Sequence, residues 1–313
     1  MRVSANIKMK IITFTPSVAY DIHCRAQSLA LNKENKVTLT SYDPGGKGVN
    51  LSRALLSLGK RSAAIAVLGE DNMKIFLDSL KNVEIDFIPV ITSGRIRENV
   101  TVHTDDGKET RISFDGGECG EGLADRVASE LLRIAEGGDI LAVSGRIPEG
   151  MMERGLKALL CELREMGVRI VIDSRSVSKD DLFDIKPFLV KPNEEELEIY
   201  TGVKPRSFEE ALKAADELIS RGVENVLVSL GSLGAVLKGS LGEYSAAAPK
   251  IEVISTIGAG DSALAGFIYA YSEGMTSADC LKYAVASGSA ACLTEGTCPP
   301  EKNNISDFLK KMQ

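Results

Sequence analysis

Between about residues 120 and 230, segments with helical periodicity alternate with short apolar runs that are typical of buried strands. Ala124, Val127, Leu131 and Ile134, for example, recur at intervals of three and four positions and precede the apolar run 139–143. Strands that are connected by helices of this length lie parallel in one sheet, with the helices on its faces. The alternation therefore predicts an α/β fold with a doubly wound, mostly parallel sheet flanked by helices.

The first third of the chain contains a different, strand-rich pattern. Apolar and polar residues alternate through 100–102 and 110–114, and the Asp-Asp-Gly sequence at 105–107 is typical of a tight turn between two antiparallel strands. Residues 11–43 also contain strand-like runs. We therefore expect residues 1–313 to form a single domain, in which a small β-sheet is built discontinuously from about 11–44 and 88–116 and the remainder forms the α/β core.

Polar residues directly follow four of the predicted core strands, at 144–145, 173–174, 191–193 and 229–231. Ligands of open α/β sheets bind beyond the carboxyl ends of the strands. Each of these segments alone would also fit a simple strand-ending turn. Four of them at one edge of the sheet predict a binding site there.

The turn Gly258-Ala259-Gly260-Asp261 opens a predicted helix, because apolar residues follow it at helical spacing. Unpaired N–H groups in the first turn of a helix attract anions, and glycines let a phosphate come close to the backbone. Asp261 places a carboxylate beside this anion site, a combination that suits phosphoryl transfer. The alternative is a glycine-rich turn in which Asp261 only caps the helix.

A second glycine-rich turn, Gly45-Gly46-Lys47-Gly48, also opens a predicted helix. It is not a P-loop, because Gly48 and not Ser or Thr follows the lysine. Its glycines bring backbone and a lysine close to a ligand, and Asn50 on the first helical turn can point its amide into the same cleft. The alternative is a flexible turn with a solvated lysine.

Composition excludes several other classes of function. The net charge is −7 and the basic residues are dispersed, so we expect no nucleic-acid partner. Six cysteines without a Cys-x-x-Cys pair, together with only two histidines, predict free thiols and no zinc site. No apolar run approaches about eighteen residues and the first residues lack a signal-peptide core, so we expect no membrane contact and a cytoplasmic location, with translation starting at Met1 or Met9.

Three motifs together resemble those of the PfkB (ribokinase-like) family of sugar kinases. They are GGKGVN at 45–50, KPNEEE at 191–196 and STIGAGDS at 255–262, in the family's order and at its usual distances. The resemblance covers nearly the whole chain. It implies a ribokinase-like fold in which the small β-sheet is a lid, ATP as the phosphoryl donor, Mg²⁺ as the metal, and a homodimer formed through the lid.

Finer similarities point to the phosphosugar branch of this family, which includes 1-phosphofructokinase and tagatose-6-phosphate kinase. Segments 94–99, 144–148 and 229–231 are similar to the G-x-T-R-x-N, SGSLP and SLG motifs of that branch. The branch's TPNPALD reads TPSVAYD at 15–21, Arg146 replaces the second serine of SGSLP, and T-x-x-NEPG reads TRISFDG at 110–116. These replacements fall in acceptor-facing segments, so the exact sugar stays open while the nucleotide end keeps the family pattern.

The resemblance also implies roles at the nucleotide end. Asp261 matches the catalytic base that takes the proton of the sugar hydroxyl, and the adjoining amides would stabilise the charge on the transferred group; these are the amides of Gly258, Ala259 and Gly260. Asn193 and Glu196 match the N-x-x-E element that organises water around Mg²⁺. ATP is expected to contact Lys191, Asn193, Ser229 and Gly231, although Lys191 would equally fit a solvated lysine at a strand end.

At the acceptor end, Asp21 matches the aspartate that fixes sugar hydroxyls. We expect Arg97 to hold the existing phosphate of a sugar phosphate, since guanidinium binds phosphate in a bidentate fork. The other expected acceptor residues are Gly45, Gly46, Lys47, Asn50, Asn99, Ser144 and Arg146.

The leading hypothesis is therefore an ATP-dependent kinase that converts fructose 1-phosphate to fructose 1,6-bisphosphate. The alternatives are a tagatose-6-phosphate kinase, a kinase of an unphosphorylated sugar or nucleoside, and a non-catalytic regulator that binds a sugar or nucleotide. Arg97 and Asn99 argue against the unphosphorylated acceptor, and the intact GAGD and N-x-x-E motifs argue against the regulator.

Overall fold

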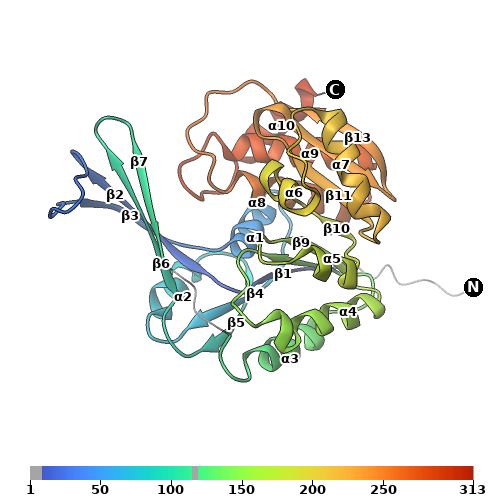
Figure 1. Ribbon diagram of the computed structural model, residues 1–313, viewed down its shortest axis with the longest axis horizontal. Coiled ribbons are helices and arrows are strands. Elements are labelled where there is room, and N and C mark those ends of the chain that lie inside the picture. The colour runs from blue at the N-terminus through green and yellow to red at the C-terminus, as the bar shows by residue number, and fades with distance from the viewer. Residues whose placement is uncertain (1–8, 115–118, 313) are drawn as a thin grey trace, which may run out of the picture.

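The computed structural model describes residues 9–114 and 119–312 and contains one large and one small β-sheet (Figure 1). The strands of the large sheet are β1 (Ile11–Thr15), β4 (Ala63–Gly69), β5 (Asp86–Thr92), β8 (Ile140–Ser144), β9 (Arg169–Asp173), β10 (Leu189–Val190), β11 (Asn225–Ser229), β12 (Gly234–Gly239) and β13 (Gly242–Ala247). Their order is β13-β12-β11-β10-β9-β8-β1-β4-β5. All neighbours from β5 to β11 pair parallel, and β12 and β13 add an antiparallel edge. The predicted doubly wound, mostly parallel sheet is confirmed.

Helices cover both faces of this sheet. They are α1 (Lys47–Ser57), α2 (Met73–Leu80), α3 (Leu123–Ile134), α4 (Lys157–Glu165), α5 (Lys179–Ile185), α6 (Glu194–Thr201), α7 (Phe208–Ser220), α8 (Ala259–Ser272), α9 (Ser277–Ala291) and α10 (Lys302–Lys311), with short helical turns at Met152–Leu156 and Gly231–Leu233. Successive residues of a buried strand point to opposite faces. Leu141 and Val143 of β8 accordingly join a core cluster with α3 to α7, while Ile140 and Ala142 join a second cluster with α1, α8 and α9. Within the described ranges, no helix is both long and apolar enough to cross a membrane.

The small sheet projects from the body of the molecule (Figure 1). It consists of β2 (Ala19–Ala26), β3 (Thr38–Gly45), β6 (Arg97–Thr104) and β7 (Glu109–Ser113) in the order β3-β2-β6-β7. The β6–β7 hairpin was predicted, and a parallel pairing of β2 with β6 joins it to the β2–β3 hairpin.

The structure corrects the predicted limits of the small sheet, 11–44 and 88–116. Residues 11–15 form β1 and residues 86–92 form β5, and both strands belong to the large sheet. All five residues of β1 are buried because the strand lies between β4 and β8 and is covered on both faces. Residues 115 and 116 lie outside the described residues.

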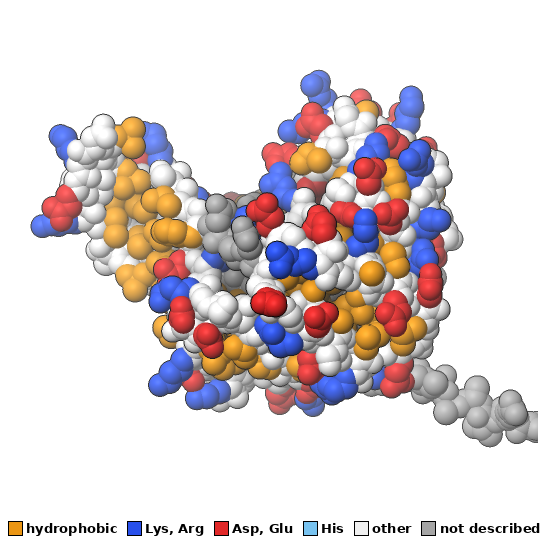
Figure 2. All heavy atoms as spheres, turned by 60° about the horizontal axis from the view of Figure 1, so that its bottom comes forward, with side chains coloured by type: hydrophobic (Ala, Val, Ile, Leu, Met, Phe, Trp, Pro, Cys, Tyr) orange, Lys and Arg blue, Asp and Glu red, His pale blue; other side chains and the backbone are white. Residues whose placement is uncertain are grey.

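The two faces of the small sheet differ in chemistry, as the alternation of side chains along a strand predicts. One face is polar and carries Asp21, Asn99 and Arg111. The other face is apolar and partly exposed, and Figure 2 shows hydrophobic side chains gathered on the projecting sheet. Ile112 and Leu39 on this face are more than half exposed, at 53% and 58%.

Candidate active site

The predicted binding segments meet at the carboxyl ends of the core strands. Ser144 ends β8 and pairs with Asp173 at the end of β9, while Lys191 directly follows β10. Asn193 forms a parallel bridge with Ser229 at the end of β11. The four polar segments identified in the sequence therefore share one edge of the sheet, where ligands of this fold class bind.

Asp261 lies in the first turn of α8, and it is only 7% exposed. Gly258 is the N-cap residue of this helix and adopts the left-handed conformation (φ 77°). No side chain makes a capping hydrogen bond there, so the alternative role of Asp261 as a helix cap does not hold. The side-chain amide of Asn50 donates to Asp261 Oδ2 at 3.0 Å. Asn50 and Asp261 are 211 positions apart in the sequence, so this hydrogen bond brings the two glycine-rich segments together at one carboxylate.

Burial, followed by the charge of Asp173, raises the pKa of Asp261 from an ordinary value of 3.8 to about 6. Lys47, Lys191 and the Asn50 hydrogen bond act in the opposite direction. A carboxylate with this pKa is still ionised at neutral pH, but it holds a proton more readily than an ordinary aspartate. These are the properties of a general base.

Asp173 is a second buried carboxylate in the same site. The sequence analysis includes it in one of the four strand-end segments but assigns it no individual role. Its Oδ1 lies 3.0 Å from Lys47 Nζ and 3.4 Å from Lys191 Nζ, and its Oδ2 has no hydrogen-bond partner. Burial acts to raise the pKa of Asp173, but the two lysines outweigh burial and lower it. Lys191 is 4% exposed, which excludes the alternative of a solvated strand-end lysine.

The N-x-x-E element forms the amino terminus of α6. Asn193 Oδ1 accepts from the backbone N–H of Glu196 at 2.8 Å, and Glu196 Oε2 accepts from the backbone N–H of Asn193 at 3.1 Å, which is a complete capping box. Glu196 is 6% exposed and its Oε1 lies 3.7 Å from Arg175 Nε. The described residues contain no group of three or more His, Cys, Asp or Glu side chains that could chelate a metal. As a buried carboxylate at the edge of the sheet, Glu196 is suited to hold a hydrated ion through water.

The acceptor residues gather on the polar face of the small sheet. Asn99 Nδ2 donates to Asp21 Oδ1 at 2.9 Å, and Arg97 Nη1 donates to Asn99 Oδ1 at 3.3 Å. A Cβ at Gly45 would lie 3.1 Å from Asp21 Oδ2, so this glycine lets the sheet backbone approach the carboxylate. These contacts give Asp21, Asn99 and Arg97 one fixed arrangement.

Arg111 is an acceptor-side residue that the sequence analysis missed. Its guanidinium lies 3.3 Å from Asp21 Oδ1. Burial lowers the pKa of Arg97, and the charges of Arg146 and Arg111 act in the same direction, while Asp21 opposes them. Arg97 therefore lies in the field of two further cations. The alternation of β7 against β6 was the available signal, because it places Arg111 on the same face as Asn99.

Other predicted residues lie at the same edge of the sheet. Ser144 is buried with a hydroxyl that has no hydrogen-bond partner, and Arg146 is exposed two residues later. Gly46 has φ 148° and its Cβ would lie 2.9 Å from Thr15, so the turn before α1 requires a glycine there. Gly231 is exposed at the start of a short helical turn.

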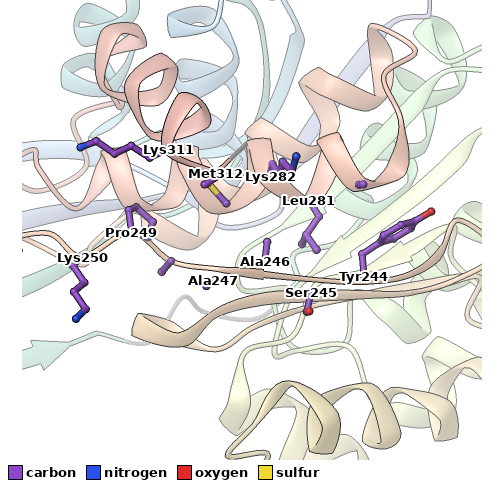
Figure 3. A pocket seen from close by; sticks show the side chains of 12 residues that line it. Tyr244, Ser245, Ala246, Ala247, Pro249, Lys250, Leu281, Lys282, Lys311 and Met312 are labelled. Atoms are coloured by element: carbon purple, nitrogen blue, oxygen red, sulfur yellow. The ribbon is translucent and has the colours of Figure 1, made fainter.

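A separate cavity of about 560 Å³ lies between β13, α9 and the end of α10 (Figure 3). Its lining includes Lys250, Lys282 and Lys311 and apolar side chains such as Leu281. The amines of the three lysines point in different directions in Figure 3, so they do not form one anion site. None of the predicted site residues lines this cavity.

Comparison with known proteins identifies the family of this chain. The pfkB family carbohydrate kinase description matches residues 12–304. The chain is 33% identical to a 1-phosphofructokinase of Borreliella burgdorferi, over 96% of this chain and 95% of that protein, and 30% identical to a 1-phosphofructokinase of Haemophilus influenzae, over 97% of each. Phosphofructokinase-2 from Escherichia coli in complex with potassium has a TM-score of 0.88 at 27% identity, covering 97% of this chain and 99% of that one. The same enzyme in complex with fructose-6-phosphate has a TM-score of 0.86 at 26% identity. The chain therefore belongs to the pfkB family of carbohydrate kinases, whose phosphoryl donor is ATP.

Proposed function

We propose that this carbohydrate kinase transfers the terminal phosphoryl group of ATP to fructose 1-phosphate and so forms fructose 1,6-bisphosphate. The observation that carries the proposal is the positive charge around Arg97. Arg111 pairs with Asp21, and the charges of Arg146 and Arg111 both act on Arg97. A phosphate on the acceptor would be attracted by this positive charge, and it would give the buried Nε of Arg97 a hydrogen-bond acceptor, whereas an unphosphorylated sugar offers no such anion. The 1-phosphofructokinase names of the two bacterial relatives support the same acceptor.

In this proposal Asp261 accepts the proton of the sugar hydroxyl as that oxygen attacks phosphorus. Asn50 orients the carboxylate through its 3.0 Å hydrogen bond. The backbone amides of Gly258, Ala259 and Gly260 begin α8, where the helix dipole and unpaired N–H groups stabilise the negative charge of the transferred group. Lys47 and Lys191 add two positive charges within 3.4 Å of Asp173.

At the nucleotide end, ATP would contact Lys191, Asn193, Ser229 and Gly231. Mg²⁺ would neutralise charge on the ATP phosphates during transfer. The residues fit a hydrated ion, because Glu196 and the unpartnered Oδ2 of Asp173 are buried anionic oxygens at the same sheet edge. Asn193 would act by fixing Glu196 through the capping box.

A second candidate acceptor is fructose 6-phosphate. It is supported by the likeness to E. coli phosphofructokinase-2, which has been solved with that sugar phosphate. Tagatose 6-phosphate is a third acceptor with the same charge and a similar shape. The positive charge around Arg97 supports any of the three over a sugar without phosphate.

The test is ADP release by the purified protein with ATP, Mg²⁺ and, separately, fructose 1-phosphate, fructose 6-phosphate, tagatose 6-phosphate and fructose. We expect the highest kcat/KM for fructose 1-phosphate and a much lower value for fructose. A higher kcat/KM for another phosphosugar would reassign the acceptor within the same class. Comparable turnover of fructose would refute the phosphosugar proposal, and binding without any ADP release would favour a non-catalytic regulator.

We also propose a homodimer formed through the apolar face of the small sheet. An uncovered apolar sheet face is an association surface, and Ile112, Phe114 and Leu39 on it are each more than half exposed. A tetrameric form of E. coli phosphofructokinase-2 is among the similar structures. Val102 on the same face is only 4% exposed and packs against Cys24 and Ala26, so it belongs to the interior of the sheet within one chain.

We also propose that the protein is located in the cytoplasm. All six cysteines are free thiols in the structure, three of them buried, as in proteins of a reducing compartment.

A further inference from the structure

A hydrogen-bonded link joins the core to the base of the small sheet, and it centres on Asn72. The side-chain amide of Asn72 donates to the carbonyl oxygen of Ile96 at 3.1 Å, and its Oδ1 accepts from the backbone N–H of Ile96 at 2.7 Å. The Tyr20 hydroxyl donates to the carbonyl oxygen of Asn72 at 2.7 Å. Ile96 directly precedes Arg97, and Tyr20 directly precedes Asp21. One core residue thus contacts the neighbours of both proposed acceptor residues.

The start of α2 lacks two hydrogen bonds of an ordinary helix start, because the groups that would make them take part in this link. Asn72 occupies the N-cap position, where an asparagine side chain usually accepts a bond from the first turn, yet it makes no such bond. The Tyr20 hydroxyl also accepts from the backbone N–H of Phe76 at 3.0 Å. It therefore bridges the carbonyl and the N–H group that the first bond of the helix would join. Both groups are used to hold the small sheet.

The backbones on the two sides of the link also lie very close together. A Cβ at Gly69, the last residue of β4, would lie 2.5 Å from the carbonyl carbon of Arg95 and 2.7 Å from the nitrogen of Ile96. Two backbone hydrogen bonds, from residues 70 and 71 to the carbonyls of residues 92 and 94, measure 2.9 and 3.1 Å. Residues 69–72 therefore hold segment 92–96 along its length, up to the position where β6 begins.

We propose that Asn72 is a positioning residue for phosphosugar binding, which fixes the bases of the two strands that carry Asp21 and Arg97. The inference rests on the proposed function for the identity of those acceptor residues. Tyr20 is fully buried and Ile96 is 3% exposed, so water cannot readily replace the lost hydrogen bonds in a variant. A small displacement of a substrate-positioning group is enough to reduce catalysis strongly, because the bound geometry is narrowly defined.

The test is steady-state kinetics of Asn72→Ala with the sugar phosphate that the wild type uses best. We expect the KM for the sugar phosphate to rise about fivefold or more, with the KM for ATP within about twofold of wild type, since the nucleotide residues lie on other elements. Asn72→Asp keeps an oxygen that accepts from the Ile96 N–H and should recover part of the loss. Tyr20→Phe removes the hydroxyl bridge and should act in the same direction as Asn72→Ala.

Asn225 provides a matched control for a purely structural effect. It is fully buried, its Nδ2 donates to the carbonyl of Phe188 at 3.0 Å, and its Oδ1 accepts from the N–H of Leu241 at 2.9 Å. It lies at the amino end of β11, at the opposite end of the strand from Ser229. Asn225→Ala should therefore lower the Tm while the KM for the sugar phosphate stays within about twofold of wild type.

A selective rise in the sugar-phosphate KM for Asn72→Ala, absent in Asn225→Ala, supports the inference. If both variants lower the Tm and neither changes that KM, Asn72 is only a structural residue and the inference is overturned. The inference and the proposed function can fail separately. A wild type that phosphorylates fructose and no sugar phosphate overturns the proposed function. Hydrogen exchange of the Ile96 amide tests the hydrogen bonds of Asn72, and an unchanged exchange rate in Asn72→Ala overturns the inference that Asn72 holds Ile96.

Discussion

Replacing Asp261 by Asn should stabilise the protein at neutral pH while it removes most of the activity. The pKa of Asp261 is raised from 3.8 to about 6, mainly by burial and next by Asp173, so the folded protein binds this proton more readily than the unfolded chain. Between these two values the folded state holds more protons, and the free energy of unfolding therefore falls as the pH rises through this window. Above about pH 6 the folded protein carries a buried carboxylate that opposes folding.

The size of the effect follows from the same pKa. A rise from 3.8 to about 6 corresponds to about 3 kcal/mol, at about 1.4 kcal/mol for each pH unit. This figure already includes the opposing effects of Lys47, Lys191 and the Asn50 hydrogen bond. Asparagine retains an oxygen that can accept from Asn50, so we expect a gain of about 1 to 3 kcal/mol at pH 7.5. Because an amide cannot take the proton of the sugar, kcat should fall by about 100-fold or more.

Asp173→Asn is the matched comparison and should have the opposite sign. Asp173 is as deeply buried, but its lysine partners outweigh the effect of burial and lower its pKa. Its contribution to stability is therefore present above the unfolded pKa and is lost as the pH falls through the folded pKa. Removing the charge deprives Lys47 and Lys191 of the anion that both contact, so the free energy of unfolding should decrease at pH 7.5.

Urea denaturation of the wild type and both variants between pH 4 and pH 8 measures these effects. The gain in Asp261→Asn should shrink toward pH 4, where the wild-type carboxylate is protonated as well. If Asp261→Asn is no more stable than the wild type at pH 7.5, or if its gain does not depend on pH, the account of Asp261 as a destabilising buried base is refuted.

Three further predictions concern the metal, the first helix and association. Glu196→Gln keeps an oxygen for the capping box but loses the charge, so the Mg²⁺ concentration for half-maximal rate should rise; an unchanged Mg²⁺ titration would exclude this role. Gly48→Ala would place a Cβ in steric conflict with Thr15 Oγ1 and displace α1. The free energy of unfolding, measured by urea denaturation, should fall by about 1 to 3 kcal/mol, and kcat/KM should fall as well. Ile112→Asp adds a charge to the exposed apolar face of the small sheet and should weaken the proposed dimer in sedimentation velocity, whereas an active wild-type monomer would contradict the dimer itself.

The sequence predicts the core well because its signals are local. Helical stripes and apolar runs alternate, and each strand of the parallel sheet is buried on both faces, which makes its composition distinctive. The limits of the small sheet are harder to predict from the sequence, because a strand such as β1 has the same local pattern whichever sheet it joins. The parallel pairing of β2 with β6 depends on residues 78 positions apart, such as Asp21 and Asn99, and nothing local specifies it. Alternation also shows that Val102 shares a face with Ile112, but it does not show that Val102 is covered.

The same distinction between local and long-range signals applies to the residues of the candidate site. Asp261, Lys47, Lys191 and Asn193 stand in glycine-rich turns or directly after strands, so the sequence alone identifies them. The pairing of Lys47 with Asp173 joins residues 126 positions apart, and that of Asp21 with Arg111 joins residues 90 apart. Asn72 gives no local signal for its role, since an asparagine before a helix is normally interpreted as a cap. Residues that act through a distant partner become identifiable only when the topology brings the partners together.

Arg97 offers the sharpest test of the acceptor, because it separates a phosphosugar kinase from a plain sugar kinase. Its Nε is buried without a hydrogen-bond partner, and Arg146 and Arg111 are close enough to lower its pKa, after burial. A phosphate would satisfy the guanidinium in a bidentate fork, with charge-assisted bonds worth about 1.5 to 3 kcal/mol, or roughly tenfold to more than a hundredfold in kcat/KM.

Arg97→Ala should therefore lose this factor for sugar phosphates, and Arg97→Lys should lose part of it, because lysine keeps the charge without the fork. Turnover of fructose, however slow, should hardly change, since fructose has no phosphate for Arg97 to hold. Arg95→Ala is the control, because Arg95 lies two residues earlier with a side chain that is 61% exposed and pairs with Glu98; its kcat/KM should stay within about twofold of wild type. If Arg97→Ala leaves every sugar phosphate within that same range, Arg97 does not bind the acceptor phosphate and the plain sugar kinase becomes the better explanation.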